Sequence, residues 1–207
     1  MLLTTGSLGS MWKDDATLIG AMERISRMST AVQPLFVALG RESAVPRGGL
    51  ANVRSVPFQS DPRSVATYLQ ASDLYIHAAR ADTAPLSVIE AMACGTTVVA
   101  TATGGIPEQI RTLDLRALRG GGRGGHVAGA TGVLVDTRDS ERMADAVLAL
   151  VADPCARAQL GANAAADARA RFSLDRQVDA YLAWYGEITA IRQQSRDERV
   201  ELLHDTV

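Results

Sequence analysis

Residues 72–110, which read SDLYIHAARADTAPLSVIEAMACGTTVVATATGGIPEQI, decide the fold of this chain. They contain two short apolar runs, residues 74–78 and 97–101, and each run predicts a buried β-strand. The residues between the runs, 87–94, predict a helix that ends at Gly95, because glycine is common just after a helix C-terminus. A strand, a helix and a second strand in this order predict two strands of a parallel sheet.

The same alternation continues on both sides of this stretch. Other apolar runs predict further strands, and segments with apolar residues at helical spacing predict further helices. We therefore expect an α/β fold, in which helices cover both faces of one parallel sheet. The additional strands are predicted at residues 2–5, 34–39, 53–58 and 132–135, and the additional helices at 16–28, 64–70, 107–111, 140–151, 155–172 and 174–191.

Length, charge and cysteine content exclude several classes of protein. The chain has 207 residues, which is enough for one α/β domain and too few for two of that size. Its formal net charge of −2 gives no basic field, so we expect no nucleic acid partner and at most peripheral membrane contact. Cys94 and Cys155 are too far apart for a usual metal or disulfide pattern. These features favour a cytoplasmic location.

Two loops at the predicted carboxyl ends of the strands have the composition of an anion site. The first loop, residues 80–86, leads into the helix at 87–94. The second contains Gly104 and Gly105 and leads into a helix that begins near Pro107. Backbone N–H groups and the helix dipole at such N-termini attract anions. The sequence therefore predicts a pyrophosphate site between these loops.

Glu90 is a carboxylate in an otherwise apolar helix. Burying it without a partner would cost several kcal/mol, so two interpretations remain open. Either the side chain faces water, or it binds paired hydroxyl groups such as those of a ribose. Asp82 precedes Glu90 by eight residues, so both acids could reach one crevice.

The whole segment resembles the hallmark of the family-4 retaining glycosyltransferases, which have the GT-B fold. That hallmark is an acid, seven intervening residues, a glutamate and a long ordered run. Here the acid is Asp82, the run from Glu90 reads EAMACGTTVVA (residues 90–100), and GGIPE follows at residues 104–108. The resemblance implies a single Rossmann-like parallel sheet that forms the C-terminal, donor-binding half of a GT-B enzyme.

The resemblance also implies an activity. Such an enzyme transfers a sugar from a nucleoside-diphosphate sugar to an acceptor and retains the anomeric configuration. The nucleotide sugar is then the donor substrate, and no metal or other cofactor is expected, because the family is generally metal-independent. A separate N-terminal acceptor-binding domain or chain is expected as a partner.

Site residues follow from the same resemblance. Asp82 and Lys13 take the catalytic positions, with Asp82 near the donor sugar and Lys13 at the lysine that neutralises the diphosphate. Glu90 corresponds to the glutamate that binds the donor ribose. The other donor-binding residues that the resemblance implies are Gly6, Ser7, Phe58, Thr83, Ala84, Pro85, Leu86, Gly104 and Gly105.

Four residues depart from the family pattern, and one of them, Thr97, replaces a common proline within a predicted strand. Asp82 is one methylene shorter than the usual glutamate, and Pro85 removes a backbone N–H from the loop. Ser7 stands where many relatives have an arginine. Either Lys13 therefore carries the diphosphate charge alone, or Arg80 substitutes for the missing arginine.

The nucleotide-sugar-binding domain is predicted to cover residues 1–191, and the polar residues 192–207 are predicted to be a frayed helix or a tail. The Gly-rich run 119–130 favours a flexible surface insertion over a phosphate loop, because it has no GxxxxGK[ST] pattern. The helix at 174–191 has an apolar face, which either binds a partner or packs on the sheet of the same domain.

Other functions remain open. The alternative is a truncated or split, non-catalytic module that holds a nucleotide or a partner. A dinucleotide-binding module of the NAD type is a third class, although Gly6-Ser7-Leu8-Gly9 lacks the GxGxxG spacing. His77 is predicted to be a packed or solvent-facing histidine rather than a catalyst, and Cys94 a small core residue.

Overall fold

The structure is a computed structural model, and it describes residues 2–5, 11–29, 33–40, 52–116, 127 and 129–204. Gly6 and Ser7, which we predicted to bind the donor, lie outside these residues. Most of the Gly-rich run 119–130 does so too. The roles predicted for these segments therefore stay predictions.

Six parallel strands form one sheet in the order β3-β2-β1-β4-β5-β6. The order reverses direction between β1 and β4, so loops diverge there at the carboxyl edge of the sheet. Each predicted strand is present, within two residues of its predicted limits. The strands are β1 (Leu2–Thr5), β2 (Phe36–Leu39), β3 (Val53–Val56), β4 (Leu74–His77), β5 (Thr97–Thr101) and β6 (Gly132–Val135).

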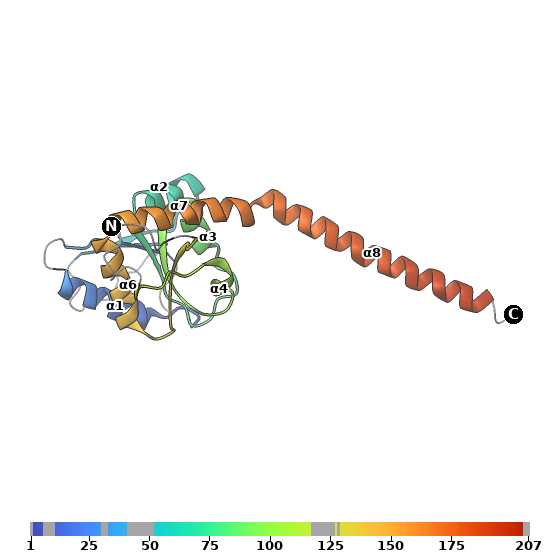
Figure 1. Ribbon diagram of the computed structural model, residues 1–207, viewed down its shortest axis with the longest axis horizontal. Coiled ribbons are helices and arrows are strands. Elements are labelled where there is room, and N and C mark those ends of the chain that lie inside the picture. Colours follow the sequence, from blue (N-terminus) through green and yellow to red (C-terminus); the bar gives the residue numbers. More distant parts are fainter. Residues whose placement is uncertain are drawn as a thin grey trace. The chain divides into compact units, whose positions relative to one another are not determined.

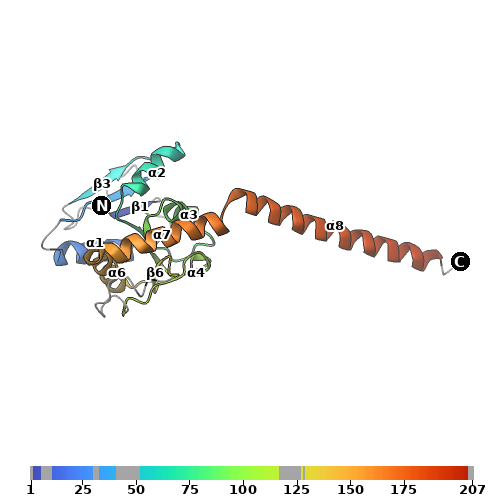
Figure 2. The ribbon, with the colours of Figure 1, turned by 45° about the horizontal axis from the view of Figure 1, so that its top comes forward.

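Helices cover both faces of the sheet, as the continuous apolar strands predict. Figures 1 and 2 show α1 and α6 side by side on one face, with α2 and α3 on the other. The described helices are α1 (Asp15–Met28), α2 (Pro62–Gln70), α3 (Leu86–Ala93), α4 (Ile106–Gln109), α6 (Ser140–Ala152), α7 (Pro154–Arg171) and α8 (Leu174–His204).

Aspartates begin three of these helices. Asp14, Asp61 and Asp139 each accept a hydrogen bond from a backbone N–H in the first turn of α1, α2 and α6. A carboxylate at this position satisfies N–H groups that have no partner within the helix.

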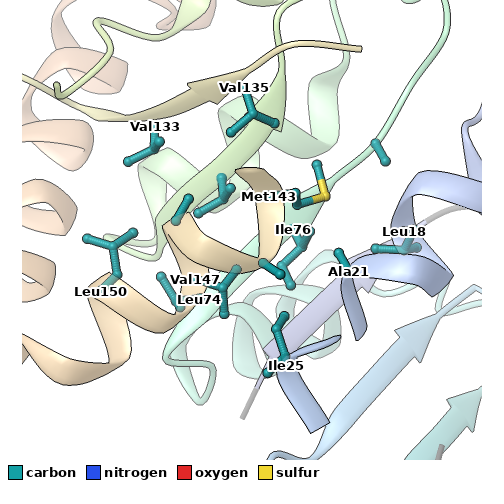
Figure 3. Close-up of a cluster of buried hydrophobic side chains, with 14 of the residues drawn as sticks. Leu18, Ala21, Ile25, Leu74, Ile76, Val133, Val135, Met143, Val147 and Leu150 are labelled. Carbon is teal, nitrogen blue, oxygen red and sulfur yellow. The ribbon is translucent and has the colours of Figure 1, made fainter. Parts of the chain in front are cut away.

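The core between the sheet and the α1–α6 face is made of aliphatic side chains. Ile25, Leu74 and Met143 are at most 1% exposed, and they come from α1, β4 and α6. Figure 3 shows these side chains directed at one another, together with Val133 and Val135 of β6. Leu74 and Ile76 point to this core, so the alternation along a strand directs Tyr75 and His77 to the opposite face.

Among the described helices, all but α8 begin and end within two residues of their predicted limits. α4 has only four residues, although Pro107 is typical of a helix start. It ends because the chain becomes extended at Ile110 and runs beside β6, where Leu113 N donates to Gly132 O at 2.8 Å. α8 continues to His204, through residues for which the sequence predicted a frayed helix or a tail.

The chain divides into two compact units, residues 1–168 and 169–207. Within the second unit, Tyr181, Trp184 and Tyr185 contact one another along α8, with ring centroids 5.5 to 6.5 Å apart. Whether this aromatic face binds a partner or packs on the sheet stays a prediction. In the described part of the chain, no helix has the length and apolarity needed to cross a membrane.

Candidate functional site

The candidate site lies at the carboxyl edge of the sheet, where β1 and β4 diverge. In open parallel sheets this is the usual place for a ligand. Lys13 follows β1, His77 ends β4 and Asp82 lies in the loop after β4. The fold thus brings together residues that are 64 and 69 positions apart in the sequence.

Lys13, His77 and Asp82 form one polar cluster. The Lys13 ammonium donates to Asp82 Oδ2 at 2.9 Å and lies 3.3 Å from His77 Nε2. Asp82 Oδ2 is 3.5 Å from the same imidazole nitrogen. The side chains of Lys13 and Asp82 remain 24% and 21% exposed, so a ligand can reach them. Both residues predicted to be catalytic therefore contact each other.

His77 is the buried member of this cluster, with only 2% of its side chain exposed. Burial, and after it the neighbouring Lys13 charge, lower its pKa from 6.5 to about 4, although Asp82 opposes both effects. The imidazole is therefore neutral at neutral pH. The prediction of a packed histidine is correct, but the sequence did not indicate that His77 contacts both predicted catalytic residues.

Backbone pairing fixes the position of Lys13. Asp14 N donates to Ala78 O at 3.1 Å, and Arg80 N donates to Trp12 O at 2.8 Å. These bonds form a short antiparallel bridge between Lys13 and Ala79. The bridge connects the start of α1 to the loop after β4, so the Lys13 side chain emerges beside His77 and Asp82.

Thr101 of β5 holds the same loop through two hydrogen bonds. Its hydroxyl accepts from Ala79 N at 2.9 Å and donates to Ala79 O at 3.0 Å. Because Thr101 is fully buried, this hydroxyl satisfies two backbone groups that water cannot reach. The sequence identified Thr101 only as a strand residue and did not indicate these hydrogen bonds.

Gly104 and Gly105 pack against the backbone of the 82–84 loop. A Cβ on Gly104 would lie 1.9 Å from Asp82 O, and one on Gly105 would lie 1.8 Å from Thr83 O. Gly105 N also donates to Asp82 O at 3.1 Å. The two glycines therefore hold the loop that carries Asp82, and this close packing explains their presence. Their predicted contact with the donor stays a prediction.

A pocket of about 430 Å³ lies between α2, α3 and the residues that follow β3. Phe58 and Glu90 both line it, so the structure brings together two residues predicted to bind the donor. Glu90 is exposed, which removes any cost of burying an unpaired carboxylate. Cys94 also lines the pocket and is only partly buried, so its prediction as a core residue is wrong.

The loop predicted to approach the donor begins α3. Pro85 is buried at the N-cap of α3, so its missing N–H removes no donor from the exposed surface. Thr83, Ala84 and Leu86 are exposed, next to Asp82.

The Arg80 guanidinium lies beside Asp14, with Nε 3.7 Å from Asp14 Oδ1. Arg80 and Arg138 line a second pocket of about 380 Å³ near the starts of α1 and α6. Asp14 is buried, accepts a hydrogen bond from the Thr17 hydroxyl and caps α1. Arg80 is therefore the partner of a helix cap. The suggestion that Arg80 assists Lys13 on the diphosphate stays a prediction.

Comparison with known proteins identifies the family. Residues 41–167 match the family model described as glycosyl transferases group 1, and these residues make up more than half of the chain. The chain belongs to the group 1 glycosyl transferases. The D-inositol 3-phosphate glycosyltransferase of Mycobacterium avium is a similar group 1 relative, 36% identical over 149 residues, or 72% of this chain. That match is 31% of the relative, so the chain spans about a third of its length.

Solved structures show the same fold. Sucrose-phosphate synthase from Thermosynechococcus elongatus superimposes with a TM-score of 0.70 and 23% identity, over 92% of this chain and 46% of that one. Anabaena HepE in complex with UDP-glucose gives 0.66 and 23%, over 88% of this chain and 48% of that one. The predicted fold, a Rossmann-like sheet like that of the C-terminal GT-B domain, is confirmed for this group 1 glycosyl transferase.

Proposed function

We propose that this domain binds a nucleoside-diphosphate sugar across the carboxyl edge of its sheet and takes part in transfer of the sugar to an acceptor. The observation that carries the proposal is the placement of two acids eight residues apart. Asp82 pairs with Lys13, and Glu90 lines the pocket beside Phe58. The residues between the two acids, which form a loop and the first turn of α3, can lie along a bound nucleotide from its sugar–phosphate end to its base.

Each part of the donor has a chemically suitable neighbour in this proposal. The Phe58 ring, which is 73% exposed, offers an apolar face to the base. The Glu90 carboxylate accepts hydrogen bonds from the ribose hydroxyl groups. The Lys13 ammonium binds the diphosphate, and Asp82 lies where the transferred sugar begins.

The Lys13 charge gives the proposal its chemistry. When the bond between the sugar and the diphosphate breaks, negative charge develops on the departing phosphate oxygen. A positioned ammonium group that is partly shielded from water stabilises this charge more in the transition state than in the ground state. The helix dipole at the start of α3 acts in the same direction. Lys13 and this helix start thus supply the electrostatic role without requiring a metal.

Three further parts of the proposal rest on the family. We infer that transfer retains the anomeric configuration and that a second domain binds the acceptor, because this chain matches about half of each solved neighbour. We also infer a cytoplasmic setting, which the two free thiols, Cys94 and Cys155, support. NMR of the glycosylated product tests retention, since a product of opposite anomeric configuration contradicts it.

Calorimetry with UDP and with GDP tests donor binding. We expect one of the two to bind with a Kd below millimolar, and Lys13→Ala to weaken that binding about 10- to 100-fold, as for loss of a charged hydrogen bond. Arg169→Ala, which removes an exposed charge from α7, is the matched control and leaves binding unchanged. If neither nucleotide binds at millimolar concentration, or if Lys13→Ala has no effect, the proposal is wrong.

A further inference from the structure

The cluster contains an acceptor that the proposed reaction does not yet use, the imidazole of His77. An ammonium group has donors only, so in the hydrogen bond of 3.3 Å between Lys13 Nζ and His77 Nε2 the imidazole nitrogen accepts; the alternative, an Nε2–H that donates to Asp82 Oδ2, spans a longer 3.5 Å. A neutral imidazole that accepts at Nε2 carries its proton on Nδ1. The geometry therefore assigns the tautomer of this buried ring.

Tyr75 completes the assignment from the other side of the ring. Its hydroxyl oxygen lies 3.3 Å from His77 Nδ1, and both side chains are buried. Nδ1–H can donate to this oxygen, which stabilises the tautomer that leaves Nε2 free to accept from Lys13. Tyr75 and His77 are two residues apart on β4, so the alternation of the strand aligns the two side chains.

The two acceptors orient the ammonium group. Lys13 directs one N–H at Asp82 and one at His77. Its third N–H has no acceptor among the described residues, so it can donate to an anion. A neutral second acceptor is important, because a second carboxylate would make the net charge of the cluster negative and repel a diphosphate. An apolar side chain at position 77 would leave the flexible lysine with one partner only.

We propose that His77 is a positioning residue, which holds the Lys13 ammonium toward the diphosphate through Nε2 while Tyr75 fixes the proton on Nδ1. This inference rests on the proposed function, since it needs a diphosphate that Lys13 binds. Its consequence is specific. Loss of His77 weakens the contribution of the diphosphate to binding and leaves the contribution of the nucleoside unchanged.

The test compares the nucleoside diphosphate that binds, UDP or GDP, with its own nucleoside, uridine or guanosine. His77→Leu is expected to weaken diphosphate binding about tenfold and to leave nucleoside binding, measured by NMR titration, unchanged. Tyr75→Phe is expected to give a smaller loss of the same kind. Val99→Ala changes a buried residue of β5 that packs on the face of the sheet opposite to His77. This variant controls for general destabilisation and is expected to affect neither ligand.

A double-mutant cycle separates positioning from a purely structural role. In a Lys13→Ala background, His77→Leu is expected to cause no further loss of diphosphate binding, because its effect passes through Lys13. The chain contains a single lysine, so ¹⁵N-lysine labelling gives one side-chain ammonium signal. We expect that signal to be sharp in the wild-type protein and broadened in His77→Leu.

The outcomes distinguish this inference from the proposed function. If the wild-type chain binds neither UDP nor GDP, the proposed function fails first. If it binds one of them in a Lys13-dependent way, but His77→Leu weakens nucleoside and diphosphate equally, the positioning role is refuted alone. Effects of His77→Leu and Lys13→Ala that multiply in the double variant would also refute it. Should His77→Leu fail to fold, Tyr75→Phe carries the same comparison.

Discussion

Replacing Gly105 by alanine tests how firmly the Asp82 loop is held. The φ angle of Gly105 is −88°, which alanine adopts without strain, so the substitution acts only through space. Its new Cβ would lie 1.8 Å from Thr83 O, against an ordinary contact of at least 3.4 Å. The 83–84 backbone must therefore move by about 1.6 Å, and the bond from Gly105 N to Asp82 O lengthens or breaks.

This displacement has two measurable costs. Overpacking and a lost hydrogen bond together lower the free energy of unfolding by about 2 to 4 kcal/mol, which lowers Tm by roughly 10 °C in a domain of this size. If the proposed function holds, a shift of more than 1 Å beside Asp82 also lowers sugar transfer about 100-fold when the acceptor-binding domain is supplied. Thermal unfolding, calorimetry with UDP or GDP and transfer assays measure these effects.

Gly186→Ala is the matched control, because Gly186 lies within α8 and a Cβ there has nothing within 4 Å. Alanine favours a helix by about 1 kcal/mol over glycine, so this control keeps or raises Tm. If Gly105→Ala unfolds at the wild-type temperature and binds nucleotide with wild-type affinity, the Gly105 backbone does not hold the Asp82 loop.

Three other predictions follow from buried or half-buried groups. Because the pKa of His77 is lowered to about 4, the unfolded chain takes up more protons below pH 6.5. Stability therefore falls as pH decreases from 6.5 toward 4, by about 3 kcal/mol, and urea titrations of His77→Gln should lack this part of the loss. Thr101→Val, which keeps the shape but leaves Ala79 N and O without the hydroxyl, is expected to cost about 3 kcal/mol, whereas Thr101→Ser retains most of the stability. Burial, with Glu90, raises the pKa of the Cys94 thiol; iodoacetamide should therefore modify Cys94 more slowly than the exposed Cys155, and a bound nucleotide should slow only Cys94. Equal protection of both thiols would place the nucleotide elsewhere.

The strands were predictable because their apolar runs are short, and some are rich in β-branched residues or lie next to glycine, as residues 36–39 lie next to Gly40. The run TVVAT at residues 97–101 became β5 within its predicted limits. Helix lengths were less predictable. The end of α4 is followed by extended chain in which Leu113 pairs with Gly132, and no local signal near Pro107 reveals a partner so much later in the sequence.

The site was partly predictable from the sequence. What could not be predicted depends on contacts between residues that are far apart in the chain. Asp82, Lys13, Glu90 and Phe58 carry a recognisable pattern, and the structure places them in one cluster and one pocket. The sequence did not reveal the contacts of His77, because one of its partners is a lysine 64 positions away. One available signal was the alternation along β4, which puts Tyr75 and His77 on the same face.

The meeting of β1 and β4 has a consequence for the order in which the protein folds. Lys13 belongs to the half of the sheet built from β1 to β3, whereas His77 and Asp82 belong to the half built from β4 to β6. A folding intermediate with only one half formed has no complete cluster, so it cannot bind a diphosphate through Lys13. A bound nucleotide should therefore slow unfolding without accelerating the early steps of refolding, and its capture during refolding would report the moment at which the two halves join.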